Sequence, residues 1–220
     1  MYITRWEVVW ENLPALLAGL VLGLEVAVGS ILVGSIIGLL AAFARTSSNR
    51  VLQRAVSAYI EFVRNLPLLL IIFFAYYGLP QFGIRFLDNV GSLVLALAVY
   101  SGAYLTEIFR AGILAVSKGF QEAGRSIGLT QVQVARFVTM PLMFRIVLPS
   151  LSNTFISLFK DTSLGAAIAV PELTYAGMVL NTNTWRILES WSAIGALYLA
   201  TCYGLALMMR RVERHYASWA

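Results

Sequence analysis

The sequence predicts an all-α membrane protein with five transmembrane helices, and two observations indicate this class. Of the 220 residues, 59% are hydrophobic and only 12% are charged, whereas soluble domains carry roughly 25% charged residues. Long apolar stretches also recur along the chain, and most approach the ~20 residues that a helix needs to cross about 30 Å of hydrocarbon. We therefore expect a single transmembrane domain over residues 1–220.

The five expected spans are apolar stretches separated by polar or proline-containing segments. They cover approximately Leu13–Ala44, Leu66–Leu79, Ser92–Leu114, Leu142–Phe159 and Trp191–Met209. The first is longer than a perpendicular crossing requires, which predicts a tilt or an overhang. The second is short, so we expect the helix that carries Tyr59–Val63 to extend it, with a kink or a start at Pro67.

The distribution of lysine and arginine predicts the orientation of these spans. With the amino terminus outside, twelve of the sixteen cations, Arg64 among them, fall in cytoplasmic segments. Three fall outside, at Arg5, Arg85 and Arg186. Cytoplasmic loops carry such an excess, so we expect the amino terminus outside and the carboxyl terminus in the cytoplasm. Glu107 and Arg110, three residues apart near a helix end, are expected to form an ion pair.

Several kinds of site are excluded by composition. The chain has one cysteine, Cys202, and one histidine, His215, so a disulfide framework, a Cys-based metal site and Ser-His catalysis are not expected. No GxxxxGK[ST] sequence is present, so the chain is not expected to bind ATP through a P-loop. We therefore predict no catalytic residue, metal or cofactor in this chain.

The longest connection, about residues 115–141, is polar and predicted to be cytoplasmic. "EAGRSIG" predicts a short helix that stops at Gly128, and Thr130 with Gln133 forms a capping box for a second helix. Val134, Phe137 and Val138 are spaced for one face of this helix, and Pro141 is expected to end it. Periodicity alone fits a loop helix lying on lipid equally well.

The residues of this connection resemble a known family pattern. Glu122-Ala123-Gly124, three residues, Gly128, nine residues, Val138, one residue and Met140-Pro141 resemble the "EAA" loop of permeases of binding-protein-dependent ABC importers. Gly124, Val138 and Met140 replace Ala, Ile and Leu of that pattern. Four further segments are similar to the polar amino acid branch of these permeases: "FVRNLPLLLIIFFAYYGLP", "YSGAYLTEIFRAGILAVSKG", "RIVLPSLSNTFISLFKDTSL" and "PELTYAG".

The resemblance implies a type I importer permease fold in the bacterial inner membrane, with a periplasmic amino terminus. It implies a second permease copy or a paralogue, ABC ATPase subunits that hold ATP and Mg, and a periplasmic or lipid-anchored amino-acid-binding protein. Nucleic acid is not an expected partner. The residues expected to couple to the ATPase are Glu122, Ala123, Gly124, Gly128, Thr130, Val134, Phe137 and Pro141.

Polar groups at membrane depth are costly and often line a substrate pathway. The candidates are Arg64, Asn65, Lys160, Asp161, Thr162, Ser163 and Glu172. Other roles remain open: a Lys160–Asp161 pair, a helix cap at Asn65, and a cap of a short helix at Glu172. The segment "FVRNLPLL" weakly favours an acidic amino acid as the substrate.

Two other functions compete with an ATP-driven importer. An ion-coupled transporter or channel would need no ATPase, but such folds typically show internal repeats, and none is visible. A membrane enzyme would need paired carboxylates or a Ser/His arrangement, and no span contains one.

Overall fold

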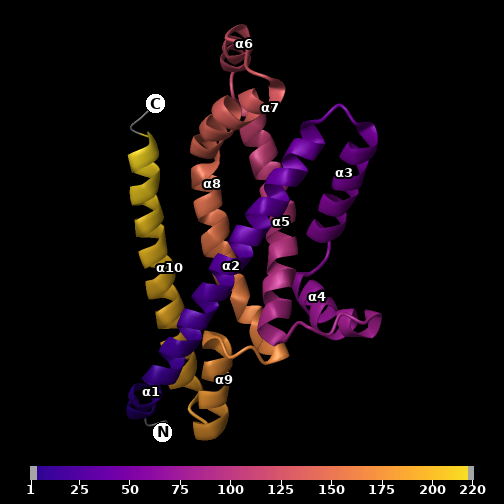
Figure 1. The fold of residues 1–220 in the computed structure, drawn as a ribbon. Coiled ribbons are helices and arrows are strands. Elements are labelled where there is room, and N and C mark those ends of the chain that lie inside the picture. The colour runs from indigo at the N-terminus through magenta and orange to yellow at the C-terminus, as the bar shows by residue number, and fades with distance from the viewer. Residues whose placement is uncertain (1–3, 218–220) are drawn as a thin grey trace.

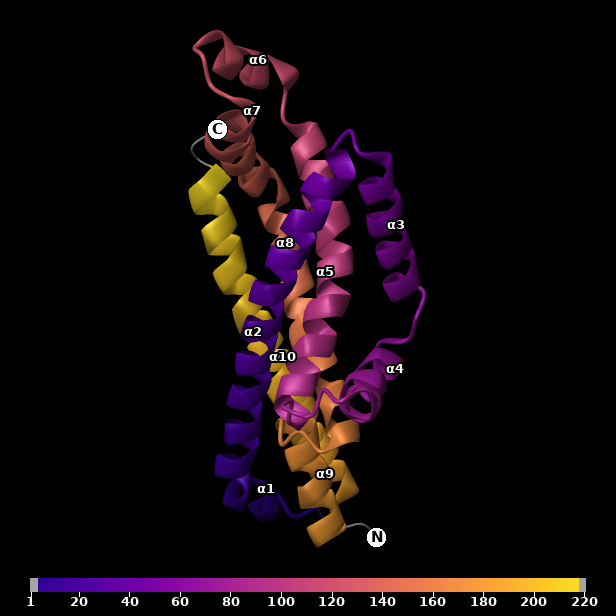
Figure 2. The same ribbon diagram turned by 45° about the vertical axis from the view of Figure 1, so that its right-hand side comes forward.

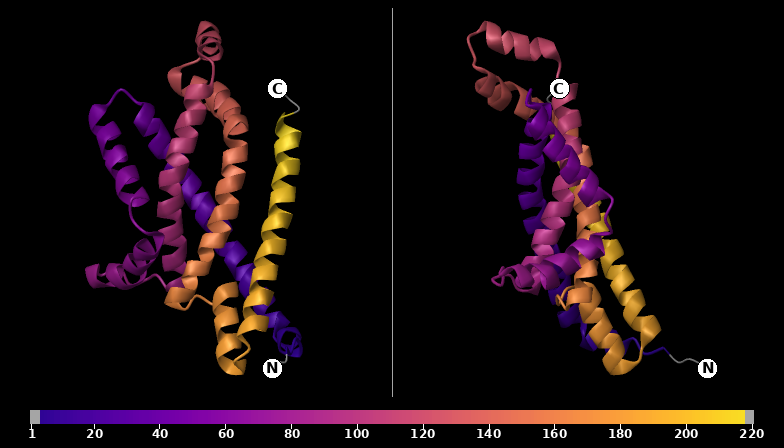
Figure 3. Two further views of the ribbon diagram at one scale, coloured as in Figure 1. Left: turned by 180° about the vertical axis from the view of Figure 1, so that it is seen from behind. Right: turned by 90° about the vertical axis from the view of Figure 1, so that its right-hand side faces the viewer.

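The computed structural model describes residues 4–217 as an elongated bundle of helices (Figure 1). One end of the bundle carries α1 (Glu7–Glu11) and α9 (Leu173–Thr184), and the other carries α6 (Lys118–Ser126) and α7 (Gln131–Val134). We call Lys118–Val134 the elbow. The C-terminal helix α10 (Ile187–Ala217) finishes at the elbow end, opposite the start of the chain, as two further views show (Figure 3).

Helix α2 (Leu13–Thr46) crosses the bundle obliquely and packs along α5 (Asn89–Ala115). The buried face of α2 consists largely of small residues at intervals of three or four: Gly19, Gly23, Ala27, Ser30, Gly34, Gly38 and Ala42. At Gly38, an added Cβ would lie 2.7 Å from Leu105 Cβ and 3.1 Å from the Gly102 carbonyl oxygen. Small residues therefore let the two backbones approach closely, as in other membrane helix pairs.

The second predicted span is broken. Helix α3 (Arg50–Arg64) and the segment Leu68–Phe82, which starts with α4 (Leu68–Phe73), meet at an angle of 104°. α4 lies at one side of the bundle, next to α5 (Figure 2). The expected start at Pro67 is confirmed, because Pro67 is the N-cap of α4. The helix that carries Tyr59–Val63 precedes this segment as expected, and the bend lies where proline disfavours helical geometry at the preceding residue, Leu66.

Four helical segments of the described chain are long and apolar enough to cross a membrane, and the bent pair would make a fifth. α2 and α5 contain the first and third predicted spans, and α8 (Met140–Asp161) and α10 contain the fourth and fifth. α9 was not among the predicted spans, because its twelve residues are too few to cross a membrane, but a short helix capped by Glu172 was one of the open alternatives.

The expectation that Pro141 ends a helix is also wrong. Pro141 lies in the first turn of α8, and a π-helical turn at Ala135–Thr139 joins α7 to α8 without a break. A proline ring clashes with the carbonyl four residues back, here that of Phe137, in a regular α-helix. Phe137 lies in the π turn, which is wider than a regular α-helical turn. The helix then continues into the fourth span.

Two apolar clusters hold the bundle together between its ends. Near the middle, Val26, Ile72, Leu97 and Leu158 join α2, α4, α5 and α8. Toward the elbow, Leu105, Phe109, Met143 and Val147 join α5 to α8. α5 contributes to both clusters, so the helix that leads into the elbow is also the central packing element.

Candidate functional site

The elbow is a pair of short helices joined by a sharply defined turn. The N–H of Gly128 donates to the Arg125 carbonyl (2.9 Å) and the N–H of Leu129 to the Gly124 carbonyl (3.2 Å). This is a Schellman ending for α6, and Gly128 has the left-handed φ of +88° that the motif uses. The capping box is confirmed: the Gln133 N–H donates to Thr130 Oγ1, and the Thr130 N–H donates to Gln133 Oε1.

The two limbs of the elbow meet at Gly124. Gly124 is buried, and an added Cβ would lie 3.3 Å from Val134 Cγ2 and 3.4 Å from Val138 Cγ2. Val134 is 4% exposed, whereas Phe137 is 60% exposed, so the prediction that all three apolar residues share one face is wrong for Phe137. The π turn starts between Val134 and Phe137 and changes the angular spacing that a regular helix would give.

The rest of the elbow faces outward. Glu122, Ala123, Gly128, Thr130 and Pro141 are exposed. Large apolar side chains are exposed with them, namely Phe120 (56%), Ile127 (79%) and Val132 (77%), together with Phe137 just beyond. So many large exposed apolar side chains in one short segment favour a protein or membrane contact there.

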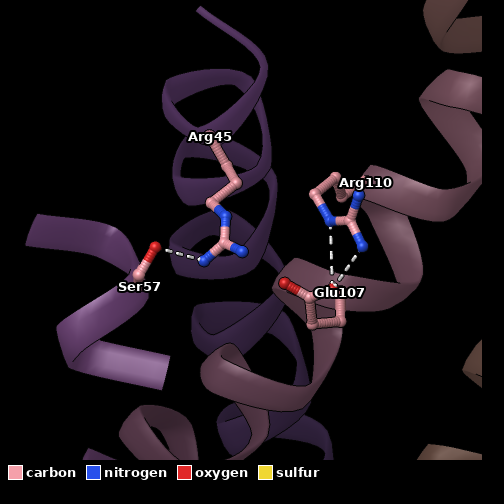
Figure 4. A network of polar contacts seen from close by, with 4 residues as sticks. All are labelled: Arg45, Ser57, Glu107 and Arg110. Atoms are coloured by element: carbon pink, nitrogen blue, oxygen red, sulfur yellow. Dashed lines mark hydrogen bonds and ion pairs between the residues drawn. The ribbon is translucent and has the colours of Figure 1, made fainter. Parts of the chain in front are cut away.

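A polar network lies at the base of the elbow (Figure 4). Arg110 donates through Nε and Nη2 to Glu107 Oε2, at 3.0 and 2.7 Å, which confirms the predicted ion pair. Arg45 of α2 donates to Ser57 Oγ of α3 at 2.6 Å. The Arg45 guanidinium points toward Glu107, so polar groups of α2, α3 and α5 gather where α5 approaches the elbow.

A second feature is a polar cavity of about 340 Å³ between α5 and α8. It is lined by Tyr100, Ser101, Tyr104, Asn153, Thr154, Ser157, Leu158 and Asp161. The Tyr100 hydroxyl donates to the Tyr104 hydroxyl at 3.3 Å, with the rings 4.9 Å apart. Hydroxyl, amide and carboxylate groups therefore converge in a bundle that is otherwise mostly apolar.

Two opposite charges flank this cavity. Asp161 lines it directly, and the Arg64 guanidinium lies 4.8 Å from the centre of the Tyr104 ring. Tyr100 interacts electrostatically with both. Because Tyr104 lies well inside α5, Arg64 is not in a cytoplasmic loop as its sequence position had suggested. Removing it from the inner set leaves eleven cations against three, and the bias remains.

The other predicted pathway residues lie outside the cavity lining. Asn65 is the C-cap of α3, and its amide donates to the Glu61 carbonyl at 2.7 Å. Lys160 is exposed and makes no ion pair with Asp161. Thr162 is fully buried and donates to the Phe159 carbonyl, and Ser163 is half-buried in the 3-10 turn Thr162–Ile168.

Glu172 has the capping role that the sequence left open. Its carboxylate accepts the N–H groups of Thr174 (2.8 Å) and Tyr175 (2.9 Å) at the start of α9, and the Tyr198 hydroxyl of α10 (2.9 Å). The side chain is fully buried. Burial raises the pKa of the Glu172 carboxyl above the ordinary value of 4.5, and these hydrogen bonds oppose the shift.

Sequence reasoning missed most of the cavity lining, although a signal was present. Ser150, Asn153, Ser157 and Asp161 recur at intervals of three or four residues along the fourth span. That spacing places polar side chains on one face of an apolar helix. Tyr100 and Tyr104 are likewise four residues apart on α5, and they complete the cavity from the other side.

Comparisons with known proteins agree with this architecture. Residues 34–218 match the family of binding-protein-dependent transport system inner membrane components. The glutamine transport system permease protein GlnP of Escherichia coli K12 is 37% identical over 210 residues, covering 95% of this chain and 96% of that protein. The L-cystine transport system permease protein TcyB of Bacillus subtilis is 37% identical, covering 95% and 90%.

Solved structures show the same fold. The crystal structure of an amino acid ABC transporter with histidines superposes with a TM-score of 0.87 at 31% identity, covering 97% of this chain and all of that one. An inward-facing MetNI methionine ABC transporter gives 0.79 at 18% identity and supports the fold alone. The chain therefore belongs to the binding-protein-dependent transport system inner membrane components, as a permease of an amino acid ABC importer.

Proposed function

We propose that the elbow is the surface held by an ABC ATPase subunit and that the polar cavity lies on the path of the amino acid. The exposed elbow, which presents Phe120, Ile127 and Val132, supports the first part. A short helix with apolar contacts suits a groove on a partner protein. ATP and Mg would be bound by that partner, and this chain transmits the resulting displacement.

The charges around the cavity suit a zwitterion. Asp161 is placed to receive the ammonium group, and Arg64, beside Tyr104, to receive the α-carboxylate. The remaining lining groups, Asn153, Thr154 and Ser157, are uncharged hydrogen-bonding groups. This arrangement favours an uncharged polar side chain over the acidic one that the sequence weakly suggested, in keeping with the glutamine permeases among the relatives.

The remaining partners follow from the two ends of the bundle. The elbow end carries most of the inner cations and would face the cytoplasm, with the amino terminus in the periplasm of a bacterial inner membrane. The α9 end would then meet a periplasmic or lipid-anchored binding protein. A second copy of this chain, or a paralogous permease, would complete the pathway.

Uptake by the complete transporter in proteoliposomes tests the cavity. Asp161→Asn removes one charge-assisted hydrogen bond, worth about 1.5–3 kcal/mol, so glutamine uptake should fall about tenfold or more. Lys160→Gln is the matched control, because it removes the neighbouring charge outside the cavity lining and should leave uptake within about twofold.

The same uptake measurements distinguish whether the cavity lies on the pathway and which side chain it favours. Equal uptake by wild type and Asp161→Asn would remove the cavity from the pathway. A wild-type preference for glutamate or arginine over glutamine would leave the pathway in place but overturn the uncharged side chain. Arg64→Gln should weaken transport of every amino acid tested, because the α-carboxylate is common to all of them.

A further inference from the structure

The end of α10 carries an unusual concentration of cations. Arg210, Arg211 and Arg214 lie within five residues and are all exposed. Within residues 4–217, none of the three makes an ion pair, a hydrogen bond or a ring contact. Glu213 is the one acidic residue among them, so the segment 210–214 has a net charge of +2 from three arginines and one glutamate.

Some other arginines at this end of the bundle have protein partners. Arg45 donates to Ser57, Arg110 pairs with Glu107, and Arg136 lies 5.6 Å from the centre of the Phe137 ring. The three arginines of α10 have no partner within the described chain. Arg50, Arg54 and Arg125 share this property, but only on α10 do three such arginines lie within five residues. A group of charges without such partners suits a ligand of opposite charge.

The position of the arginines along α10 matches the depth of a bilayer interface. Arg211 follows Trp191 by twenty residues, about 30 Å along a helix axis at 1.5 Å per residue. That equals the hydrocarbon thickness of a typical bilayer. With Trp191 at one interface, where tryptophan is enriched, Arg211 reaches the other at the level of the lipid phosphates.

The face of α10 above the arginines is apolar and uncovered. Leu199 (72% exposed), Tyr203 (64%) and Leu207 (41%) follow one another at intervals of four residues, and Arg211 is the next position in the same column. Residues four apart lie on one side of a helix. A single ligand could therefore contact this apolar column and the cationic end together.

We propose that this column and the three arginines form a binding site for an anionic phospholipid. An acyl chain lies along Leu199, Tyr203 and Leu207, and the headgroup phosphate binds Arg211 with Arg210 and Arg214. Arginine binds phosphate in bidentate geometry. A cytoplasmic protein could satisfy the arginines alone, and a second permease could cover the apolar column alone, whereas an anionic lipid accounts for both.

Native mass spectrometry of the complete permease–ATPase complex tests this site. The complex is incubated with equal amounts of phosphatidylglycerol and phosphatidylcholine of the same acyl chains, and the retained lipids are counted. Wild type should retain phosphatidylglycerol preferentially. Arg211→Gln/Arg214→Gln should weaken that preference roughly fivefold for each arginine removed.

Arg50→Gln/Arg54→Gln is the matched control, because it removes two exposed arginines from α3 at the same end of the bundle. The control should keep the wild-type preference, and if it loses as much as the α10 variant the site is refuted. Loss of the ATPase with lipid retention unchanged would instead assign the arginines to a protein contact. If the double variant does not purify, Arg214→Gln alone should show a single fivefold step, and no step would equally refute the site.

Discussion

Gly128 shows how one residue can set the shape of the elbow. Its φ of +88° is left-handed, and a β-branched residue there costs roughly 1–2 kcal/mol or forces the turn to open. No neighbouring atom lies within 4 Å of an added Cβ, so the constraint is conformational rather than steric.

Gly128→Val should therefore reorient α7 against α6 and abolish ATPase association and uptake, while insertion into the membrane continues. Gly204→Val is the control, since Gly204 lies outside the elbow, is also exposed with nothing within 4 Å of an added Cβ, and has no such backbone geometry. Co-purification of the ATPase with each variant measures the difference. Retention of a fully active complex by Gly128→Val would contradict the role given to this turn.

The buried Glu172 carboxyl should make the stability of the fold depend on pH. Burial raises the pKa of its carboxyl. Its contribution to stability is therefore present in full below the unfolded value near 4.5 and is lost as the pH rises through the folded value. Glu172→Gln stays neutral, so its Tm in detergent should fall less between acid and neutral pH than that of wild type.

Glu11→Gln, at an exposed position on α1, should retain the wild-type pH dependence of the Tm. Thermal unfolding at a series of pH values distinguishes these cases. Parallel curves for wild type and Glu172→Gln would mean that the Glu172 carboxyl titrates alike in the folded and unfolded chains.

The close contact between α2 and α5 makes a prediction at the scale of helix packing. Gly38→Ala would place a Cβ 2.7 Å from Leu105 Cβ and 3.1 Å from a backbone oxygen that cannot move aside. Overpacking of this kind costs about 1–3 kcal/mol, and each kcal/mol should lower the Tm by roughly 2–4 °C in a chain of this length.

Gly29→Ala is the control on the same helix. Its added Cβ meets only Val94 Cγ1, at an ordinary 3.9 Å, and alanine is the better helix former by about 1 kcal/mol. Its Tm should therefore equal or exceed that of wild type. A Gly38→Ala variant as stable as Gly29→Ala would show that the two helices can separate without cost.

The helices also show how much of the fold could be predicted from the sequence. Spans α2, α5 and α10 follow from apolar length alone, and the turn at Gly128 and the Thr130 cap follow from local chemistry. The direction that the chain takes after each proline could not be predicted from the sequence. Pro67 precedes a bend of 104°, whereas Pro141 lies within a continuous helical segment, because packing against other helices decides between a break and a π turn.

In the candidate site, too, local contacts were predictable from the sequence and contacts between helices were not. The capping residues of the elbow interact within a few positions of sequence, so pattern reasoning located them. The cavity joins Tyr100 and Tyr104 of α5 to Asp161 of α8 and places Arg64 of α3 beside them. These contacts depend on how three helices pack, and Arg64 could not be placed at this depth without the bend that follows it.

At the scale of the whole molecule, α5 connects the elbow to the polar cavity. Tyr104 lines the cavity, and Ala115 ends the helix just before the elbow. Ala115 is eleven residue steps beyond Tyr104, about 16 Å at 1.5 Å per residue. Packing against α2 and α8 makes this stretch stiff, so a displacement of the elbow would reach the cavity through α5. Damage to either region should therefore give a different functional failure.

Two valines at the elbow end of the bundle test this separation. Val132 on the elbow is 77% exposed and Val51 on α3 is 76% exposed, so aspartate at either position meets mainly solvent in the isolated chain. Val132→Asp would place a carboxylate in the apolar surface proposed to enter the ATPase groove. It should lose ATPase co-purification and uptake together, whereas Val51→Asp should keep both. Asp161→Asn should keep the ATPase bound and hydrolysing ATP while uptake falls, because its defect lies in the cavity. Normal uptake by Val132→Asp would place the ATPase contact elsewhere on this chain, since an unpaired buried carboxylate in that contact could not be tolerated.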